Sequence, residues 1–351
     1  MTGWPSGAAT GIGSLPGSDI VEAVKTVFGE LLELPYLPEL PARGPGAELT
    51  GRTAGLLVDL PVELYAAQWR FAARPGLDLR RTHDLRERDL DALTEIADGY
   101  AGPLKLQVAG PWTLAATLDL PVGGRVLRDP GAVRDLVDSL ADGLAGHLAE
   151  VAARVPGTSL VLQLDEPALP AVLAGAVPTE SGLNRHRPVE QPVAGAALRR
   201  LVDRVRSASV DRVRSVSGDG AGESATRLPV VVHCCAPDVP LALLRDAGAD
   251  AVSLDLDMLN LDLAAVLDPL GEALDAGFGL FAGAVPTSPP APGGAEVADR
   301  VRGLWRRFGF AEEKLPEQVV VTPACGLAGA TPAYAREAMT VCREAARRLA
   351  D

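Results

Sequence analysis

Short continuous apolar stretches recur along this chain, and most are followed by a longer segment in which apolar residues have helical spacing. Continuous apolar stretches are typical of parallel strands that are buried on both faces, whereas half-exposed strands alternate apolar and polar residues. The pattern therefore predicts parallel strands that alternate with helices. Eight stretches are candidate strands, at residues 11–14, 34–40, 104–109, 160–165, 230–235, 251–255, 278–282 and 319–324.

Capping signals mark the starts of several predicted helices. Ser18 can cap the first helix, Asp129 a long helix in the middle of the chain, and Thr331 the last helix. A proline follows each of the last two caps, at the position where a helix tolerates it best.

Eight strand-helix units predict an α/β fold of the (β/α)8 TIM barrel class, with inserted loops and extra helices. Such a barrel usually needs ~250 residues. We therefore expect one barrel domain over residues 1–351, with the surplus in insertions at about 41–102 and 170–228. The second insertion repeats VDRVRSAS as VDRVRSVS over residues 202–217, which predicts an extended helix end, and a Gly- and Ser-rich loop is predicted at 218–226.

Composition narrows the classes of function. The net charge of −13 argues against nucleic acid or an anionic membrane as the main partner, because both attract basic surfaces. We expect no secretion signal and no membrane span, since no basic segment precedes an apolar core at the N-terminus and no apolar run is long enough for a bilayer. Four cysteines without framework spacing predict reduced thiols and a cytoplasmic protein.

Polar side chains gather where the predicted strands end. In a (β/α)8 barrel the carboxyl ends of the strands carry the chemistry, and the opposite ends of these strands show nothing comparable. The residues at the carboxyl ends are Ser14, Glu39, Asp165, His233, Cys235, Asp255 and Cys325.

Four of these residues can close around one metal ion: His233, Cys235, Asp255 and Cys325. One imidazole, two thiolates and a carboxylate form a suitable ligand set for Zn²⁺. Strand alternation puts His233 and Cys235 on one side and Cys234 on the other, so we expect Cys234 to pack in the core. A single histidine in such a place is usually a hydrogen-bonded core residue, but the neighbouring thiols favour a ligand here.

The segment LQLDEPALP, residues 162–170, places two acidic residues at the end of a buried strand. Buried carboxylates are costly unless they are hydrogen-bonded or hold a cation. We expect Asp165, which shares a strand face with Gln163, to contact a substrate ammonium group. Bracing of a loop is the alternative role, and it suits Glu166 better.

Seven segments together resemble the catalytic barrel of cobalamin-independent methionine synthase. This family belongs to a superfamily that also contains uroporphyrinogen decarboxylase and zinc methyltransferases that use corrinoid donors. The segments are TGIGSLPG (10–17), LPEL (37–40), AGPWTLA (109–115), QLDEPAL (163–169), VVHCC (231–235), ADAVSLD (249–255) and PACGL (323–327). The chain resembles the short, core form of the family, without an extra N-terminal barrel.

The resemblance implies roles for particular positions. Zinc ligands of the family fall on His233, Cys235, Asp255 and Cys325. Homocysteine-binding positions fall on Ile12 and Ser14 at the carboxylate end, and on Asp165 and, by a looser match, Glu39 at the amine end. Asp165 and Asp255 are the candidate catalytic carboxylates.

The sequence departs from the family pattern in three places. The acidic zinc ligand is usually Glu, one methylene longer than Asp255, which leaves Asp257 as an alternative. The family has a His that is implicated in protonating the folate leaving group, at about the position of Ala284. An aromatic platform for the pterin ring is replaced by Thr117.

The resemblance implies a homocysteine S-methyltransferase that makes methionine, an enzyme of amino-acid biosynthesis. A zinc-activated homocysteine thiolate would attack a donor methyl group, with methyl-tetrahydrofolate (5-methyltetrahydropteroyltriglutamate) as the family donor. Two alternatives remain open. One is a zinc enzyme that transfers methyl from a corrinoid protein to a thiol, and the other is a zinc-binding homologue without catalysis.

Overall fold

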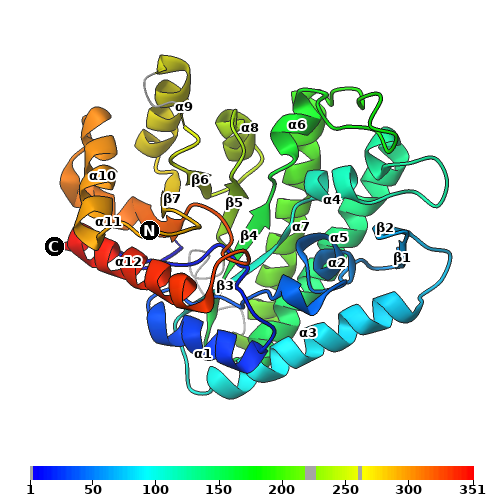
Figure 1. The fold of residues 1–351 in the computed structure, drawn as a ribbon, viewed down its shortest axis with the longest axis horizontal. Helices are drawn as coiled ribbons and strands as arrows, with labels where there is room; N and C mark the ends of the chain where they lie inside the picture. The colour runs from blue at the N-terminus through cyan, green and yellow to red at the C-terminus, as the bar shows by residue number, and fades with distance from the viewer. Residues whose placement is uncertain (1–2, 218–226, 260–262) are drawn as a thin grey trace.

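A curved sheet of six parallel strands forms the centre of the molecule, with its strands in chain order from β3 to β8 (Figure 1). The computed structural model describes residues 3–217, 227–259 and 263–351. The fold is therefore α/β, with the six later predicted strands confirmed to within a few residues. These strands are β3 (Pro103–Ala109), β4 (Ser159–Asp165), β5 (Val230–Cys234), β6 (Ala251–Asp255), β7 (Gly279–Val285) and β8 (Val319–Pro323).

The two strands predicted first, at 11–14 and 34–40, are wrong as regular strands. Both segments are extended, but they pair only through isolated parallel bridges, which join Ala9 to β8, Tyr36 to β3, and Ser14 to Glu39. Prolines at positions 35 and 38 have no N–H to donate, so a continuous ladder cannot form there. The two segments nevertheless lie along the two edge strands of the sheet.

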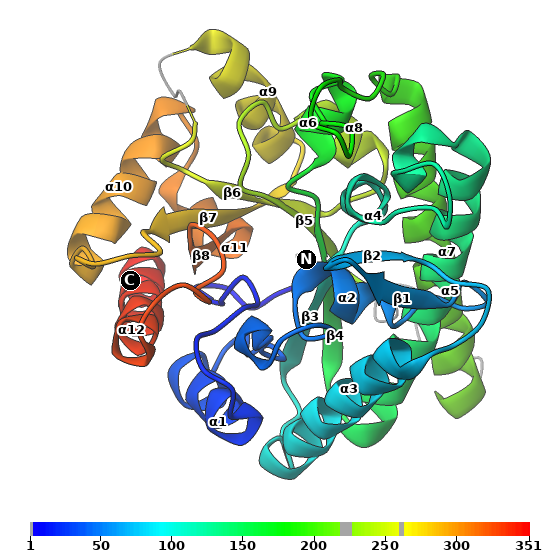
Figure 2. The same cartoon turned by 45° about the vertical axis from the view of Figure 1, so that its right-hand side comes forward.

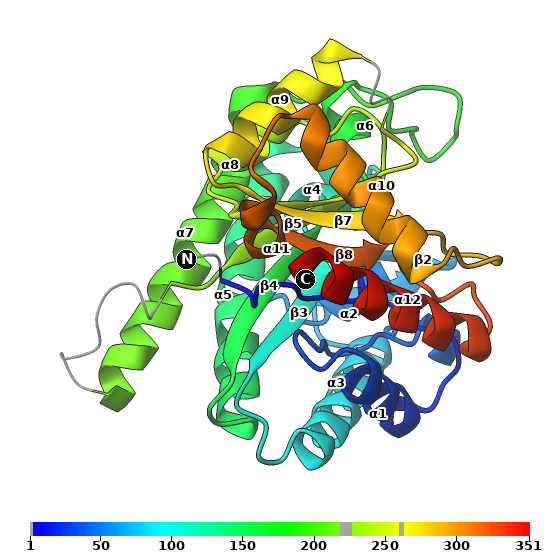
Figure 3. The same cartoon turned by 90° about the vertical axis from the view of Figure 1, so that its left-hand side faces the viewer.

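Helices cover the outer face of the sheet (Figures 1 and 2). Thr331 and Asp129 cap their helices as predicted, whereas the first helix is capped by Asp19 and not by Ser18. In Figure 3, α10 and α12 lie side by side near β7 and β8. The helices that connect or follow strands of the sheet are α4 (Pro111–Thr117), α5 (Pro130–Arg154), α6 (Leu169–Leu173), α7 (Gln191–Ser217), α8 (Leu241–Asp246), α9 (Ala264–Asp275), α10 (Gly294–Arg307), α11 (Leu315–Gln318) and α12 (Pro332–Ala350).

The first insertion and the N-terminal part add further elements. These are α1 (Ile20–Glu30), α2 (Leu49–Ala54), the antiparallel hairpin of β1 (Val62–Tyr65) and β2 (Gln68–Phe71), and α3 (Leu77–Ile96). The duplicated sequence at 202–217 continues α7, as predicted, and the loop predicted at 218–226 lies outside the described residues. Within the described ranges, no helix combines the length and the apolar content needed to cross a membrane.

An apolar layer fills the space inside the curved sheet beneath the polar strand ends. Trp4 packs edge-on against Phe281 with ring centroids 5.1 Å apart, and a side chain at Gly279 would collide with the Trp4 ring. Strand alternation places the residues two positions further along each strand in the next layer. That next layer contains the polar side chains of Gln163, His233, Ser253 and Thr322, so the apolar layer supports them from below. The apolar layer consists of Trp4, Ala8, Leu34, Val161, Val231, Ala251, Phe281 and Val320.

Candidate functional site

Three of the predicted metal ligands come together: His233, Cys235 and Cys325. Their ligand atoms all lie within 4.8 Å of one another. The sulfurs of Cys235 and Cys325 are 3.2 Å apart, and the Cys325 sulfur is 3.7 Å from Nε2 of His233. His233 lies in β5 and Cys235 follows it, while Cys325 follows β8, so the curvature of the sheet brings opposite parts of the chain together.

Ser253 orients the His233 ring. Its hydroxyl lies 3.0 Å from Nδ1 of His233, and the two residues are register partners on the adjacent strands β5 and β6. This contact leaves Nε2 facing Cys325. Histidines that bind metals typically use their other ring nitrogen in such a hydrogen bond, which fixes the ring and its tautomer. Sequence reasoning missed Ser253, and the signal was a polar residue inside the apolar strand AVSLD.

The two thiols differ in acidity. The hydrogen bond between the two sulfurs, together with the nearby His233, lowers the pKa of Cys325 to about 4. The same sulfur–sulfur contact and burial raise the pKa of Cys235. Metals bind the thiolate form of cysteine, and the lowered pKa of Cys325 favours that form. An ion of the size of zinc would hold sulfurs ~3.8 Å apart and sulfur and nitrogen ~3.6 Å apart in a tetrahedral site. The two printed distances, 3.2 Å between the sulfurs and 3.7 Å between the Cys325 sulfur and Nε2, are therefore close to those that such an ion needs.

Asp255, the fourth predicted ligand, lies at the end of β6 next to this group. Its Oδ1 accepts a hydrogen bond of 2.9 Å from the backbone N–H of Asp257, and among the described residues the three-membered group does not extend to it. The Asp257 carboxylate is exposed and pairs with Arg300 at 2.7 Å. Ligation by Asp255 stays a prediction.

The remaining two cysteines are buried away from these donors. Cys234 points to the other side of β5, and burial raises its pKa to about 12. Cys342 lies on the core face of α12, where burial raises its pKa as well. Buried thiols of this kind stay protonated and pack as small apolar groups.

Ser14 lies against the turn that carries Cys325. The backbone N–H of Leu327 donates to the carbonyl of Ser14 at 2.8 Å. A Cβ at Gly326 would lie 2.2 Å from the Ser14 hydroxyl, so this position has no room for a side chain. The N-terminal segment predicted to bind a substrate is thus packed against the loop of a predicted metal ligand.

Asp165 and Glu39 are both buried, at 6% and 4% exposure. Asp165 is the register partner of His233 on the neighbouring strand. Burial raises the pKa of Asp165 to about 7, although the His233 charge opposes the shift. Burial also raises the pKa of Glu39, against the effect of Arg52 at 3.8 Å. A cationic ligand would offset the cost of ionising both groups.

Lys105 and Gln107 connect these acidic residues to the segment that carries Ile12. Lys105 donates to the Ile12 carbonyl at 2.9 Å, and Gln107 donates to Glu39 at 3.2 Å. Burial lowers the pKa of Lys105 to about 7, against the attraction of Asp165 and Glu39. Sequence reasoning missed both residues, although a lysine and a glutamine two positions apart in an apolar strand were a visible signal.

Glu166 follows β4 and braces the start of α4, which agrees with the bracing role that was its alternative. Its carboxylate accepts hydrogen bonds from the backbone N–H groups of Trp112 and Thr113 and from the Thr113 hydroxyl, at 2.8–3.0 Å. Its own N–H donates to the His233 carbonyl at 2.8 Å. Burial raises the pKa of Glu166 to about 7. The side chain also occupies the space that a Cβ at Gly110 would need.

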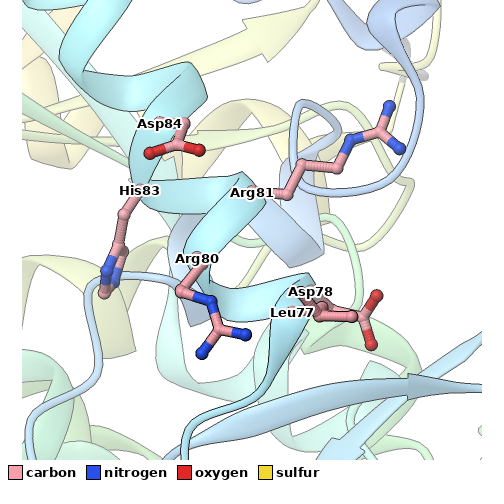
Figure 4. Close-up of a pocket in the computed structure, with 6 residues that line it drawn as sticks. All are labelled: Leu77, Asp78, Arg80, Arg81, His83 and Asp84. Carbon is pink, nitrogen blue, oxygen red and sulfur yellow. The ribbon is translucent and has the colours of Figure 1, made fainter.

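A surface pocket of about 630 Å³ lies elsewhere, at the start of α3 (Figure 4). None of the predicted site residues lines it. Its only ring, His83, is bonded to the Gly55 carbonyl at 2.9 Å. The lining residues are Leu77, Asp78, Arg80, Arg81, His83 and Asp84.

Comparison with solved structures identifies a similar fold. A B12-independent methionine synthase from Shewanella sp. W3-18-1, in complex with selenomethionine, matches with a TM-score of 0.57 and 12% identity, over 98% of this chain and 98% of that chain. At this identity the likeness shows the fold alone.

Two further matches have TM-scores too low to support an argument. They are the carboxyl transferase domain of Rhizobium etli pyruvate carboxylase (0.24, 14% identity, 72% of this chain and 43% of that chain) and a variant of mandelate oxidase (0.28, 16% identity, 94% and 92%). No curated protein matches the chain.

A family model, described as the catalytic domain of cobalamin-independent synthase, matches residues 220–348. This range contains His233, Cys235 and Cys325 and therefore the whole three-membered group. The match to the model of this family therefore covers residues 220–348, the last third of the chain, where the three candidate metal donors lie.

Proposed function

We propose that this protein is a zinc-dependent homocysteine S-methyltransferase that makes methionine. One observation carries the proposal: the His233, Cys235 and Cys325 group lies beside the buried Asp165, so donors for a metal and an acceptor for an ammonium group adjoin each other. A thiol amino acid has the two functional groups that such a site can hold at once.

His233, Cys235 and Cys325 would hold the zinc ion, with Asp255 as the fourth ligand. Zinc, when bound, stabilises the thiolate of a coordinated thiol at neutral pH, which supplies the nucleophile. Homocysteine has such a thiol, and a solved protein of similar fold binds selenomethionine, an analogue of methionine.

The protein's own residues orient the amino acid. Asp165 and Glu39 accept hydrogen bonds from its ammonium group, and the Ile12–Ser14 segment binds its carboxylate. Fixing this end of the substrate restricts where its sulfur can lie, and such orientation contributes much of the rate enhancement in two-substrate reactions. Asp255 would act on the metal and not on the amino acid, as the fourth zinc ligand.

The extended segments around Ala9–Ser14 and Tyr36–Glu39 complete, in this proposal, an eight-position barrel of one domain. Both segments carry proposed substrate contacts, and both bond to the edge strands β8 and β3. A closed barrel would keep these contacts fixed relative to His233.

Methyl-tetrahydrofolate is the donor that the family resemblance implies. Ala284, at the position of the family's proton-donating His, is buried in β7 and offers no titratable group. Thr117 donates its hydroxyl to the Thr113 carbonyl at 2.7 Å and offers no ring for a pterin. These two positions favour testing a corrinoid donor beside the folate.

Methionine formation tests the proposal directly. Zinc-loaded protein is incubated with homocysteine and, separately, with methyl-tetrahydrofolate, its polyglutamate form, methylcobalamin or a methylated corrinoid protein, and methionine is quantified by mass spectrometry. Methionine from at least one donor, and none from Cys325→Ser protein, is the expected result. Zinc binding without methionine from any donor would contradict methyl transfer and identify a zinc-binding homologue.

A further inference from the structure

Lys105 is a fully buried lysine in the middle of the proposed amino-acid site. Its ammonium donates to the Ile12 carbonyl at 2.9 Å and to Oε1 of Gln107 at 3.3 Å, and it lies 5.0 Å from the centre of the Tyr36 ring. The other two lysines of the chain, Lys25 and Lys314, are exposed. Burial of an ammonium group costs several kcal/mol unless nearby charges compensate it, so a lysine at this position needs acidic neighbours.

Hydrogen bonds join Asp165 to Glu39 through Lys105. Gln163 donates through Nε2 to Asp165 at 2.7 Å and to the Ile12 carbonyl at 2.8 Å. Lys105 donates to the same carbonyl and to Gln107, and Gln107 donates to Glu39 at 3.2 Å. The two carboxylates proposed to bind the substrate ammonium are therefore the ends of one connected network, and the Lys105 charge lies between them.

The Ile12 carbonyl is saturated by these donors, because a carbonyl oxygen has two lone pairs. Both lone pairs are taken by side chains from strands β3 and β4. The bonds fix the peptide plane that joins Ile12 to Gly13, and hence the direction of the Gly13 N–H. A side chain at Gly13 would lie 2.8 Å from Gln107, so the backbone itself fills this position.

The charges of the buried set balance. Asp89 is held by both Arg43, at 2.6 Å, and Arg52, and Arg52 reaches Glu39 at 3.8 Å. Three carboxylates and three cations are joined by these hydrogen bonds and ion pairs, which do not include Glu166, and they are Asp165, Glu39, Asp89, Lys105, Arg52 and Arg43. A ligand with one ammonium and one carboxylate keeps this balance. A ligand with the ammonium alone adds an uncompensated positive charge in a buried place.

We propose that Lys105 is a positioning and specificity-determining residue that makes the site select zwitterionic thiols over cationic thiols that lack the carboxylate. This inference rests on the proposed function, because it assumes that Asp165 and Glu39 bind the amino-acid end of a thiol. The ligand pair that separates the two charge states is homocysteine and 3-aminopropane-1-thiol, which is homocysteine without its carboxylate.

Calorimetric titration of both thiols into zinc-loaded protein tests the proposal. Lys105→Met is expected to weaken homocysteine binding at least tenfold and to leave binding of 3-aminopropane-1-thiol unchanged or tighter, so the ratio of the two Kd values shifts by tenfold or more. Lys105→Gln should shift the ratio in the same direction, because it removes the charge and keeps a donor for the Ile12 carbonyl. Lys314→Met, which removes an exposed lysine, should change neither Kd.

The outcomes separate this inference from the proposed function. Equal weakening of both thiols by Lys105→Met and Lys105→Gln, with unchanged zinc content, would show that Lys105 only supports the structure. An unchanged ratio would also overturn the selectivity. If the wild-type protein binds neither thiol, the proposed function fails first and the inference fails with it. If Lys105→Met does not fold, the comparison of Lys105→Gln with Lys314→Met decides the question.

Discussion

The sulfur atoms of Cys235 and Cys325 lie 3.2 Å apart, although ninety residues separate them in the chain. The distance is too long for a disulfide bond, which holds its sulfurs ~2.05 Å apart. The distance is also shorter than the contact distance of two thiols that are not hydrogen-bonded to each other. A thiol that donates to a thiolate explains it, and the lowered pKa of Cys325 agrees with this arrangement. Both residues also face the same imidazole, so the pair is arranged as two ligands of one ion.

Replacement of Cys325 should therefore remove the metal. Cys325→Ser loses a thiolate, and we expect zinc affinity to fall by more than the tenfold to hundredfold that loss of a supporting contact costs. Zinc content after dialysis, measured by atomic absorption, gives the result. Cys234→Ser is the matched control from the neighbouring position, and it should keep its zinc. Full zinc occupancy in Cys325→Ser protein would refute the ligand assignment.

Loss of the Ser253 hydroxyl should weaken metal binding without removing a ligand. Ser253→Ala leaves Nδ1 of His233 without its partner at 3.0 Å, so the ring can turn. The expected loss of zinc affinity is about tenfold to a hundredfold, as is usual for contacts that orient a ligand. Competition with a chromophoric chelator measures it.

The control for Ser253 is another buried hydroxyl of the sheet. Thr322 in β8 is fully buried, and its hydroxyl has no hydrogen-bond partner among the described residues. Thr322→Val should leave zinc affinity unchanged. Equal effects of Ser253→Ala and Thr322→Val would mean that polarity inside the sheet matters in general and that the contact with His233 does not.

The fourth ligand can be assigned by comparing two neighbouring carboxylates. Asp255→Ala should lower zinc affinity at least tenfold, because it removes a charged oxygen ligand next to the thiols. Asp257→Ala removes an exposed carboxylate that pairs with Arg300, and it should leave zinc affinity unchanged. The opposite order of effects would transfer the ligand role to Asp257.

Most of the sheet and the clustering of three candidate metal donors could be predicted because local patterns determine them. Continuous apolar stretches identify β3 to β8, and a period of two separates His233 and Cys235 from Cys234. The strand predicted at 34–40 was wrong because its apolar content does not reveal that Pro35 and Pro38 lack the N–H groups that a hydrogen-bond ladder needs.

The polar residues inside the sheet stand out in the sequence, but their contacts could not be predicted in the same way. Lys105 is one of three lysines in an arginine-rich chain, and the sequence does not show what it contacts. Its spatial neighbours Ile12 and Tyr36 are far from it in the sequence. Its role depends on the bridges that bring those segments to β3. The contact of Ser253 is hidden for the same reason, because its partner His233 is on another strand.

Asp165 should be needed for the amino acid and not for the metal. Asp165→Asn keeps the shape of the side chain and can still accept the hydrogen bond from Gln163, but it cannot supply a negative charge to a substrate ammonium group. We expect homocysteine affinity to fall about tenfold to a hundredfold, in line with hydrogen bonds to charged groups. Zinc content should stay the same. Unchanged homocysteine affinity, measured by calorimetry, would rule out the ammonium contact.

His147 should make the stability of the protein fall at low pH. Burial in α5, with the charges of Arg52 and Arg86 nearby, lowers the pKa of His147 from 6.5 to about 3. Between these values the unfolded chain binds a proton that the folded protein does not, so the free energy of unfolding decreases as the pH falls, by up to about 1.4 kcal/mol per pH unit. Urea unfolding at pH 7.5 and 5.0 should therefore show a loss about 2 kcal/mol larger in wild-type protein than in His147→Leu protein. His83→Leu, at an exposed histidine on α3, should behave like wild type. An equal loss in wild type and His147→Leu would contradict a buried, neutral His147.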